Sequence, residues 1–500
     1  MTRTSGVPTP ATRVTTMLLD LPTEVLTDIL LLCDTATVTE TCHVFAKIAY
    51  SVPSLWSSIY LGPSQCDFPG APELLRTRLQ RTGCQPLYIS IGLISEATTA
   101  NYKLCTILAK FSSRMRCLEL STSSPKVAGT IISDIFFSSA LVFSELQILS
   151  VLVRREERVN PAREWPRLDV VLENATERFP QLQRLCLSSL YECIPFLPRS
   201  SYFHHLHTLI LDGSMEDVWT DAALVAALLH CTPQLECLWM KHLYVEQWSD
   251  LSGPTFYGLN NVSTHIRLPH LTSLAVSVPG CASDLVYCID APALRDLHLD
   301  GSRGPFPPDE DADEDDEDDD SRINSPWYRF YVDFLLRSLK RFASRCQSVR
   351  HLAITTIYLT REGWDWLLFG DGKGPPFPNL ESIAIHCQAE SSGEIVSGFD
   401  DDLLLRFSRE PRLPLRRLAI LNSDFPLSGS AVVHAFKSII DASPNEQYEF
   451  ECDWYVPQFK DNEEFEELES LGVDVTCREI PEDEWWTYGH GIDGTDWFVY

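Results

Sequence analysis

Three short stretches hold residue types that could bind a cofactor or a metal ion. Gly489-His-Gly-Ile-Asp-Gly494 matches the Gly-x-Gly-x-x-Gly pattern of dinucleotide-binding loops, but only six residues follow it, so no helix can receive a pyrophosphate. Gly370-Asp-Gly-Lys-Gly374 lacks the Lys-Ser/Thr ending of a phosphate-binding loop. His204, His205 and His207 have no Cys-x-x-Cys or His-x-x-x-His partner for zinc. These stretches therefore predict no cofactor and no metal ion.

The densest charge in the chain is an acidic run, Asp309 to Asp320, with eleven carboxylates in twelve residues. Self-repulsion and the lack of apolar residues prevent such a run from packing, so residues 302–325 are expected to form a disordered insert. A solvated spacer is the favoured role, and a site for a basic partner is the alternative. Storage of a divalent metal is disfavoured because no glycine-turned ligand loop is present.

Composition narrows the classes of partner. The 500 residues carry a formal net charge of −30, which disfavours a nucleic acid or an anionic membrane surface as partner, because both are bound through Lys and Arg. Residues 1–16 are rich in Thr and Pro and are expected to be a disordered tail without a signal peptide, and no later stretch reaches the ~18 apolar residues of a membrane span. We therefore expect a cytoplasmic or nuclear protein, with its sixteen cysteines reduced in the core.

Two amphipathic stripes lie near the start of the chain. Pro22 suits a first helical turn, and the apolar residues that follow it recur at helical spacing as far as Cys33. A second stripe runs from Val38 to Ala49, and Leu55-Trp56 comes after it. So few residues provide little core of their own, which predicts an apolar face left for a partner.

Residues 17–61 resemble the F-box in the Leu21-Pro22-x-Glu24-Val25-Leu26-x-x-Ile29-Leu30 start, the Cys42-x-x-Phe45 segment and the Leu55-Trp56 end. The resemblance implies a short all-α module that binds the Skp adaptor of a Skp-cullin-F-box ubiquitin ligase, with Trp56 in the module's own core. It implies that the adaptor contacts are made by Leu21, Pro22, Val25, Leu26, Ile29 and Leu30. An ordinary pair of amphipathic helices is the alternative.

A helix and a strand are expected to connect this module to the rest of the chain. Residues 62–95 contain a helical pattern, Glu73 to Arg81, and a strand pattern, Pro86 to Ile91. The order of these pieces is similar to that in many fungal-type F-box proteins.

One phrase recurs ten times after residue 100: an apolar residue, two variable positions, an apolar residue, one variable position and an apolar residue. The copies are Met115–Leu120, Leu146–Val151, Leu182–Leu187, Leu206–Leu211, Leu235–Met240, Leu271–Val276, Leu294–Leu299, Val349–Ile354, Leu380–Ile385 and Leu415–Ile420. A proline often precedes the phrase, as in Phe179-Pro180 and Phe377-Pro378, and is expected to set an extended lead-in to a strand. Helical patterns such as Tyr328 to Phe342 lie between the phrases.

Strand, turn and helix at this spacing resemble the leucine-rich repeat, although the Asn that follows the strand in standard repeats is absent. The resemblance implies an α/β solenoid over residues 96–455, a curved parallel sheet with outer helices, closed by an aromatic-rich C-terminal cap over residues 456–500. An ordinary alternating α/β domain is the alternative.

Strand periodicity places the phrase leucines inward and the residues between and beside them on the concave face of such a sheet. We expect this face to bind an unknown target protein. Its predicted contacts are Arg184, Ile210, Trp239, Asp296, His298, Asp300, His351, His386 and Arg417.

These features together predict a substrate receptor rather than an enzyme, with ubiquitin transfer performed by other subunits. One alternative is a leucine-rich-repeat scaffold that binds a partner without recruiting a ligase. The other is a hydrolase. Its catalytic site would have to be dispersed along the sequence, because the chain has no Gly-x-Ser-x-Gly or zinc-protease motif.

Overall fold

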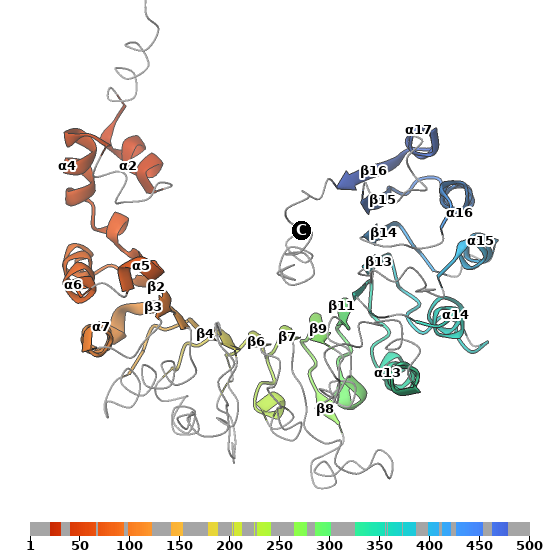
Figure 1. Ribbon diagram of the computed structural model, residues 1–500, viewed down its shortest axis with the longest axis horizontal. Coiled ribbons are helices and arrows are strands. Elements are labelled where there is room, and N and C mark those ends of the chain that lie inside the picture. The colour runs from red at the N-terminus through yellow and green to blue at the C-terminus, as the bar shows by residue number, and fades with distance from the viewer. Residues whose placement is uncertain are drawn as a thin grey trace, which may run out of the picture. The chain divides into compact units, whose positions relative to one another are not determined.

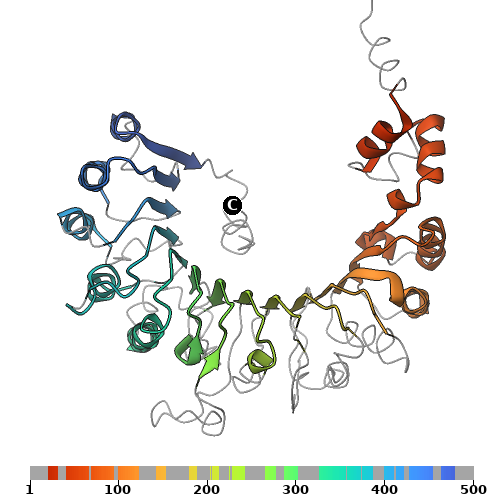
Figure 2. The same cartoon turned by 180° about the vertical axis from the view of Figure 1, so that it is seen from behind.

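The structure is a computed structural model of the chain (Figures 1 and 2). It describes residues 21–31, 41–66, 69–94, 99–122, 142–153, 179–188, 203, 205–212, 225, 228–241, 265–277, 286–301, 326–355, 357, 359–372, 374–386, 399–409, 413–421, 427–453 and 463–478. The expected tail, the acidic insert at 302–325 and the aromatic residues after 478 lie outside the described residues.

The chain divides into two compact units, Met1–Leu185 and Cys186–Tyr500, with the boundary inside a strand. The first unit opens with helices and then alternates helices with strands. Its elements are α2 (Thr23–Leu31), α4 (His43–Ser51), η1 (Pro53–Trp56), β1 (Ser58–Leu61), α5 (Pro63–Cys66), α6 (Ala71–Arg81), β2 (Leu87–Ile94), α7 (Thr99–Ala109), η2 (Ser112–Arg114), β3 (Met115–Thr122), β4 (Ile148–Val153) and the start of β5 (Arg184–Ser188).

The second unit continues with short strands, and from β11 onward helices alternate with them. Its elements after β5 are β6 (Thr208–Asp212), β7 (Cys237–Lys241), β8 (Ile266–Arg267), β9 (Ser273–Ser277), β10 (Ile289–Asp290), β11 (Asp296–Asp300), α13 (Pro326–Ala343), β12 (His351–Thr355), α14 (Arg361–Phe369), β13 (Ser382–His386), α15 (Asp401–Arg409), β14 (Arg417–Leu421), α16 (Gly429–Ala442), β15 (Tyr448–Asp453), α17 (Glu463–Ser470) and β16 (Val473–Arg478).

Fourteen of the described strands form one sheet in the order of the sequence, from β1 to β16, while β8 pairs with β10 alone. The strand pairs are parallel, as between β11 and β12, where Asp296 lies opposite His351 and Asp300 opposite Thr355. In both views α13 to α17 lie on one side of the strands β11 to β16 (Figures 1 and 2). The protein is thus an α/β protein with a long parallel sheet of sequence-adjacent strands.

Each of the ten repeated phrases overlaps a strand of this sheet, as predicted. All thirty apolar phrase positions are buried, with at most 7% of any of these residues exposed. Their burial stabilises the sheet, by about 25 cal/mol for each Å² of apolar surface removed from water. The sheet also extends beyond the phrases, from β1 at residue 58 to β16 at residue 478.

The prolines before the strands lie in tight turns, which differs from the extended lead-in that was expected. The amide of Leu182 donates to the carbonyl of Phe179, and that of Leu380 donates to the carbonyl of Phe377, over 3.1 and 3.2 Å. Proline is therefore the second residue of a four-residue turn, where its fixed φ also fits. A turn, rather than an extended segment, therefore precedes these strands and sets the direction in which the chain enters them.

Of the eleven cysteines among the described residues, all have free thiols and seven are buried as expected, whereas Cys84 is exposed and does not belong to the core. Two of the buried thiols have clearly shifted pKa values. Burial raises the pKa of Cys117 to about 11 and the pKa of Cys346 to about 12. Both thiols stay protonated at neutral pH, and a protonated thiol is neither a nucleophile nor a metal ligand.

Candidate functional site

The first candidate surface is the N-terminal helical unit, which consists of α2, α4 and η1. Its core is small and apolar, and Leu21, Phe45 and Val52 pack against it from the edge. The buried residues of that core are Leu26, Leu30, Ile48, Ala49, Leu55 and Trp56. Trp56 thus lies in the core of the unit, the position that the sequence resemblance implied.

The six predicted adaptor contacts divide between this core and the surface. Leu26 and Leu30 are each only 3% exposed and face inward. Pro22 is exposed, Val25 is 42% exposed, and Leu21 and Ile29 are half-buried. On α4, Val44 and Tyr50 are also exposed, at 44% and 55%. An apolar surface therefore remains outside a core that is already filled.

Trp56 also joins the helical unit to the α/β part that follows it. Its indole Nε1 donates to the carbonyl of Ala49 over 2.7 Å, and its ring stacks on Tyr50 with the centroids 5.9 Å apart. The guanidinium of Arg81 on α6 lies 4.4 Å from the Trp56 ring and 4.5 Å from the Tyr50 ring. Such cation–π contacts fix the position of α6 against α4 and η1.

The second candidate surface is one face of the sheet, here called the polar face. It is formed by the strand residues that lie between and beside the buried phrase positions. In-register pairing aligns its residues in rows across the strands. The middle row is Trp239, Ala275, His298, Ala353, Ala384, Ala419 and Glu451, from β7 to β15. Three consecutive alanines leave the backbone of β12 to β14 close to this face, between His298 and Glu451.

The polar residues of β11 are held by both neighbouring strands. His298 Nε2 lies 2.9 Å from Thr355 Oγ1 on β12, and Ser277 Oγ on β9 donates to Asp300 Oδ2 over 3.4 Å. Asp296 Oδ1 lies 4.0 Å from His351 Nε2. Burial is the main cause that raises the pKa of Asp296, while His351 and Arg295 lower it to a smaller extent. This part of the face can donate and accept hydrogen bonds in fixed directions.

A second polar group lies on the other side of the alanines. Arg417 Nη2 donates to Glu451 Oε2 over 2.7 Å, and Arg417 Nε lies 3.7 Å from Glu449 Oε2. Glu451 is only 4% exposed, so its carboxylate is held inside the face by the guanidinium.

The structure places the remaining predicted contacts unevenly. Trp239 is half-buried in the middle row, whereas Ile210 is 6% exposed and offers little contact area. Arg184 is exposed on β5, the strand that contains the boundary between the two units. His386 lies on β13, but its side chain is not among those that the structure describes.

The predicted contacts did not include every residue of these surfaces, although some of the missing ones could have been found from the sequence. The alanine floor of Ala353, Ala384 and Ala419 follows directly from aligning the phrases, since each occupies the position between the second and third apolar residues. Glu451 could not be found in this way because β15 lacks the phrase.

Comparison with known proteins adds no assignment: no family model matches the chain, and no curated protein matches its sequence closely enough to be a relative. In the part of the chain that the structure describes, no three His, Cys, Asp or Glu side chains group as metal ligands would. None of the described helices has both the length and the apolar composition needed to cross a membrane.

Proposed function

We propose that this protein is the substrate-recognition subunit of a Skp-cullin-F-box ubiquitin ligase. In this proposal the N-terminal helical unit is an F-box that binds the Skp adaptor. The sheet is a leucine-rich-repeat-like solenoid whose polar face captures a target protein. The chain itself performs no chemistry, because other subunits transfer ubiquitin.

The observation that carries the proposal is the apolar surface of the helical unit. Pro22 and Val25 stay exposed although the unit already has its own core. Pro22 comes directly before α2 and Val25 lies in its first turn, where the F-box resemblance implies the adaptor contacts. Exposed apolar groups beside one another are typical of a protein interface rather than of a free helix surface.

The sheet supports the second half of the proposal. Stacked strands that share one continuous core are the physical basis of repeat proteins, since no single strand can bury its apolar side alone. Ala419 is fully buried, whereas Ala353, Ala384 and the hydrogen-bonding His298 beside them are half-buried. This accessible part of the polar face suits the approach of an extended segment or a loop of another protein. Trp239 and Arg417 are of the residue types that most often dominate binding energy.

Affinity purification of the tagged full chain tests the adaptor interaction. We expect Val25→Asp to reduce the recovery of the Skp adaptor at least about tenfold, because a carboxylate would be buried unpaired in the interface. The matched control is Val142→Asp, since Val142 is also an exposed valine, at 47%, and lies outside the helical unit. Circular dichroism of both variants establishes that they are folded.

Two outcomes would contradict the proposal. If the wild-type chain recovers no adaptor, the ligase assignment is wrong and a scaffold that binds a partner through the same sheet becomes the better description. If Val142→Asp lowers recovery as much as Val25→Asp does, the adaptor is not bound at the surface of α2.

A further inference from the structure

A cavity of about 310 Å³ opens at the starts of four neighbouring strands. Each lining residue lies either one or three positions before the first residue of β9, β11, β12 or β13. They are Thr272, Ala293, Arg295, Ser348, Arg350 and Asn379. The volume is at the lower end of the range for ligand pockets, about 300–1,000 Å³, so a compact group fits better than an extended one.

The backbone places the two arginines of this cavity side by side. The amide of Arg295 donates to the carbonyl of Thr272, and the amide of Arg350 donates to the carbonyl of Arg295, both over 2.8 Å. Neighbouring strands at this spacing are about 4.8 Å apart. Two guanidinium groups therefore extend from adjacent positions of the same row.

Side-chain hydrogen bonds hold the turns that form the cavity walls. Ser348 Oγ lies 2.7 Å from the carbonyl oxygens of both Pro292 and Leu294, and Asn379 Nδ2 donates to the carbonyl of Gln347 over 3.0 Å. Each bond joins the turn before one strand to the turn before its neighbour. The walls are thus built before any ligand binds, which reduces the entropy lost on binding.

The charges of the two arginines are only partly balanced. Arg350 Nη1 lies 3.4 Å from Glu381 Oε1, whereas Arg295 is exposed and makes no ion pair with the described residues. Like charges on adjacent strands repel each other. Arg295 also lowers the pKa of the neighbouring Asp296, so part of its charge is balanced there. An anion bound between the two arginines would balance the positive charge that remains on this part of a chain with a net charge of −30.

We infer that this cavity binds a phosphate monoester. A phosphate dianion has three acceptor oxygens and about two negative charges, so it can bridge both guanidinium groups, whereas a single carboxylate satisfies only one fork. The phosphate can belong to a phosphorylated side chain of another protein or to a free phosphate ester. The inference does not depend on the proposed function.

Isothermal titration of the full chain tests this inference with four probes: inorganic phosphate, glycerol 2-phosphate, and a short peptide with either phosphoserine or glutamate at its centre. We expect the phosphorylated probes to bind the wild type. Arg295→Ala should weaken them about tenfold or more, because a charge-assisted, two-pronged contact is lost. Binding should also weaken below about pH 6, where the phosphate gains a proton.

The matched control is Arg416→Ala. Arg416 occupies the same position before β14, but it lies outside the cavity and pairs with Glu446 over 3.0 Å. We expect its loss to change affinity less than about twofold. Arg295→Lys, which keeps the charge but not the planar fork, should bind with an intermediate affinity and replaces the alanine variant if that one does not fold.

The probes also separate the sources of the phosphate. Tighter binding of the phosphopeptide supports a phosphorylated protein, and tighter binding of glycerol 2-phosphate supports a free ester. The inference is wrong if no phosphorylated probe binds at concentrations up to roughly 10 mM, or if the glutamate peptide binds as tightly as the phosphopeptide. It is also wrong if Arg416→Ala weakens binding as much as Arg295→Ala does.

Discussion

Asp296 is a residue of the polar face whose pKa is raised by its surroundings. Its side chain is 27% exposed and lies 4.0 Å from His351 Nε2. The ion contact would lower the pKa of the carboxyl, but burial has the larger effect and raises it. The folded chain therefore holds the proton of Asp296 more tightly than the unfolded chain does.

This shift predicts how stability depends on pH at Asp296. Because its folded pKa is raised, the contribution of this carboxyl to stability is present at low pH and is lost as the pH rises through the folded pKa. Asp296→Asn, which mimics the protonated form, should therefore be more stable than the wild type at pH 7. The difference should shrink toward pH 4, and urea unfolding at both pH values measures it.

An opposite result would also be informative. If Asp296→Asn is less stable than the wild type at pH 7, the attraction between Asp296 and His351 outweighs the cost of burial. Asp402→Asn, at an exposed position on α15, serves as the control for the loss of one negative charge.

For single residues, the sequence predicted which residues belong to a surface better than it predicted whether each side chain faces the core or the solvent. The stripe of α2 gave both Leu26, which faces inward, and Val25, which faces outward, because a wide apolar stripe does not show where the core ends and an interface begins. In the strands the two-residue period is stricter, so the placement of Asp296, His298 and Trp239 opposite the buried leucines followed from the phrase alone.

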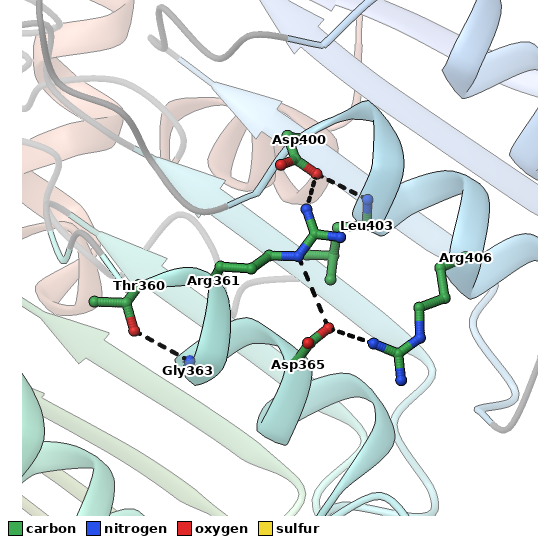
Figure 3. A network of polar contacts seen from close by, with 7 residues as sticks. All are labelled: Thr360, Arg361, Gly363, Asp365, Asp400, Leu403 and Arg406. Carbon is green, nitrogen blue, oxygen red and sulfur yellow. Dashed lines mark hydrogen bonds and ion pairs between the residues drawn. The ribbon is translucent and has the colours of Figure 1, made fainter.

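Polar contacts connect α14, α15 and α16 of the second unit. Arg361 of α14 bonds to Asp400, which also caps α15 by accepting a hydrogen bond from the amide of Leu403 over 2.8 Å (Figure 3). Asp365 of α14 accepts from Arg406 of α15 over 2.9 Å (Figure 3). The capping residue of one helix thus binds the helix before it.

The same arrangement recurs one helix later. Ser428 caps α16 by accepting from the amide of Ala431 over 3.2 Å, while its own amide and hydroxyl both donate to Asp401 of α15 over 2.7 Å. Two successive helix starts are therefore held by Asp400, directly before α15, and by Asp401, its first residue. We infer that α14, α15 and α16 keep a fixed spacing along the sheet.

Asp400→Ala tests this connection. The variant loses the cap of α15 and the bond to Arg361, so the free energy of unfolding should fall by about 1–2 kcal/mol. Asp402→Ala removes a carboxylate from the same first turn, where it is exposed, and should cost no more than about 0.5 kcal/mol. Urea unfolding followed by tryptophan fluorescence measures both. Equal losses would show that only the charge at the helix start matters, and not the connection to α14.

Elements were predictable where the phrase marked them. All ten phrases overlap strands, and the helices α6 and α13 lie where helical spacing predicted them. The strands β15 and β16 do not contain the phrase, so their place in the parallel sheet comes from pairing with a neighbour rather than from a local pattern. The polar network in Figure 3 could not be predicted from a local sequence pattern either, because its paired residues are 39 and 41 positions apart in the sequence.

At the scale of the whole molecule, the repeated phrase acts through the contacts between neighbours. The three apolar residues of each phrase pack beside those of the next strand, in register from β6 to β7 and from β9 to β14. Stability in such a sheet is the sum of many similar local contributions. This is why a degenerate phrase without the usual Asn is sufficient to specify a long parallel sheet.

The net charge opposes this stability and leads to a prediction for the complete chain. With a formal charge of −30, the folded state repels itself at low ionic strength, whereas the exposed ion pairs contribute little. Raising NaCl from about 10 to about 150 mM shortens the screening length from about 30 to about 8 Å. The midpoint of thermal unfolding should therefore rise, by roughly 2 °C or more.

The acidic run provides the comparison for this prediction. Replacing Asp309 to Asp320 by a neutral segment of equal length removes eleven of the thirty excess negative charges and leaves −19. That variant should melt higher than the wild type at low salt and gain less from added salt, because less repulsion remains to be screened. Calorimetry of both chains over the salt series measures the two slopes. A midpoint that falls as salt is added would mean that the ion pairs between helices, such as Arg406 with Asp365, outweigh the repulsion of the whole molecule.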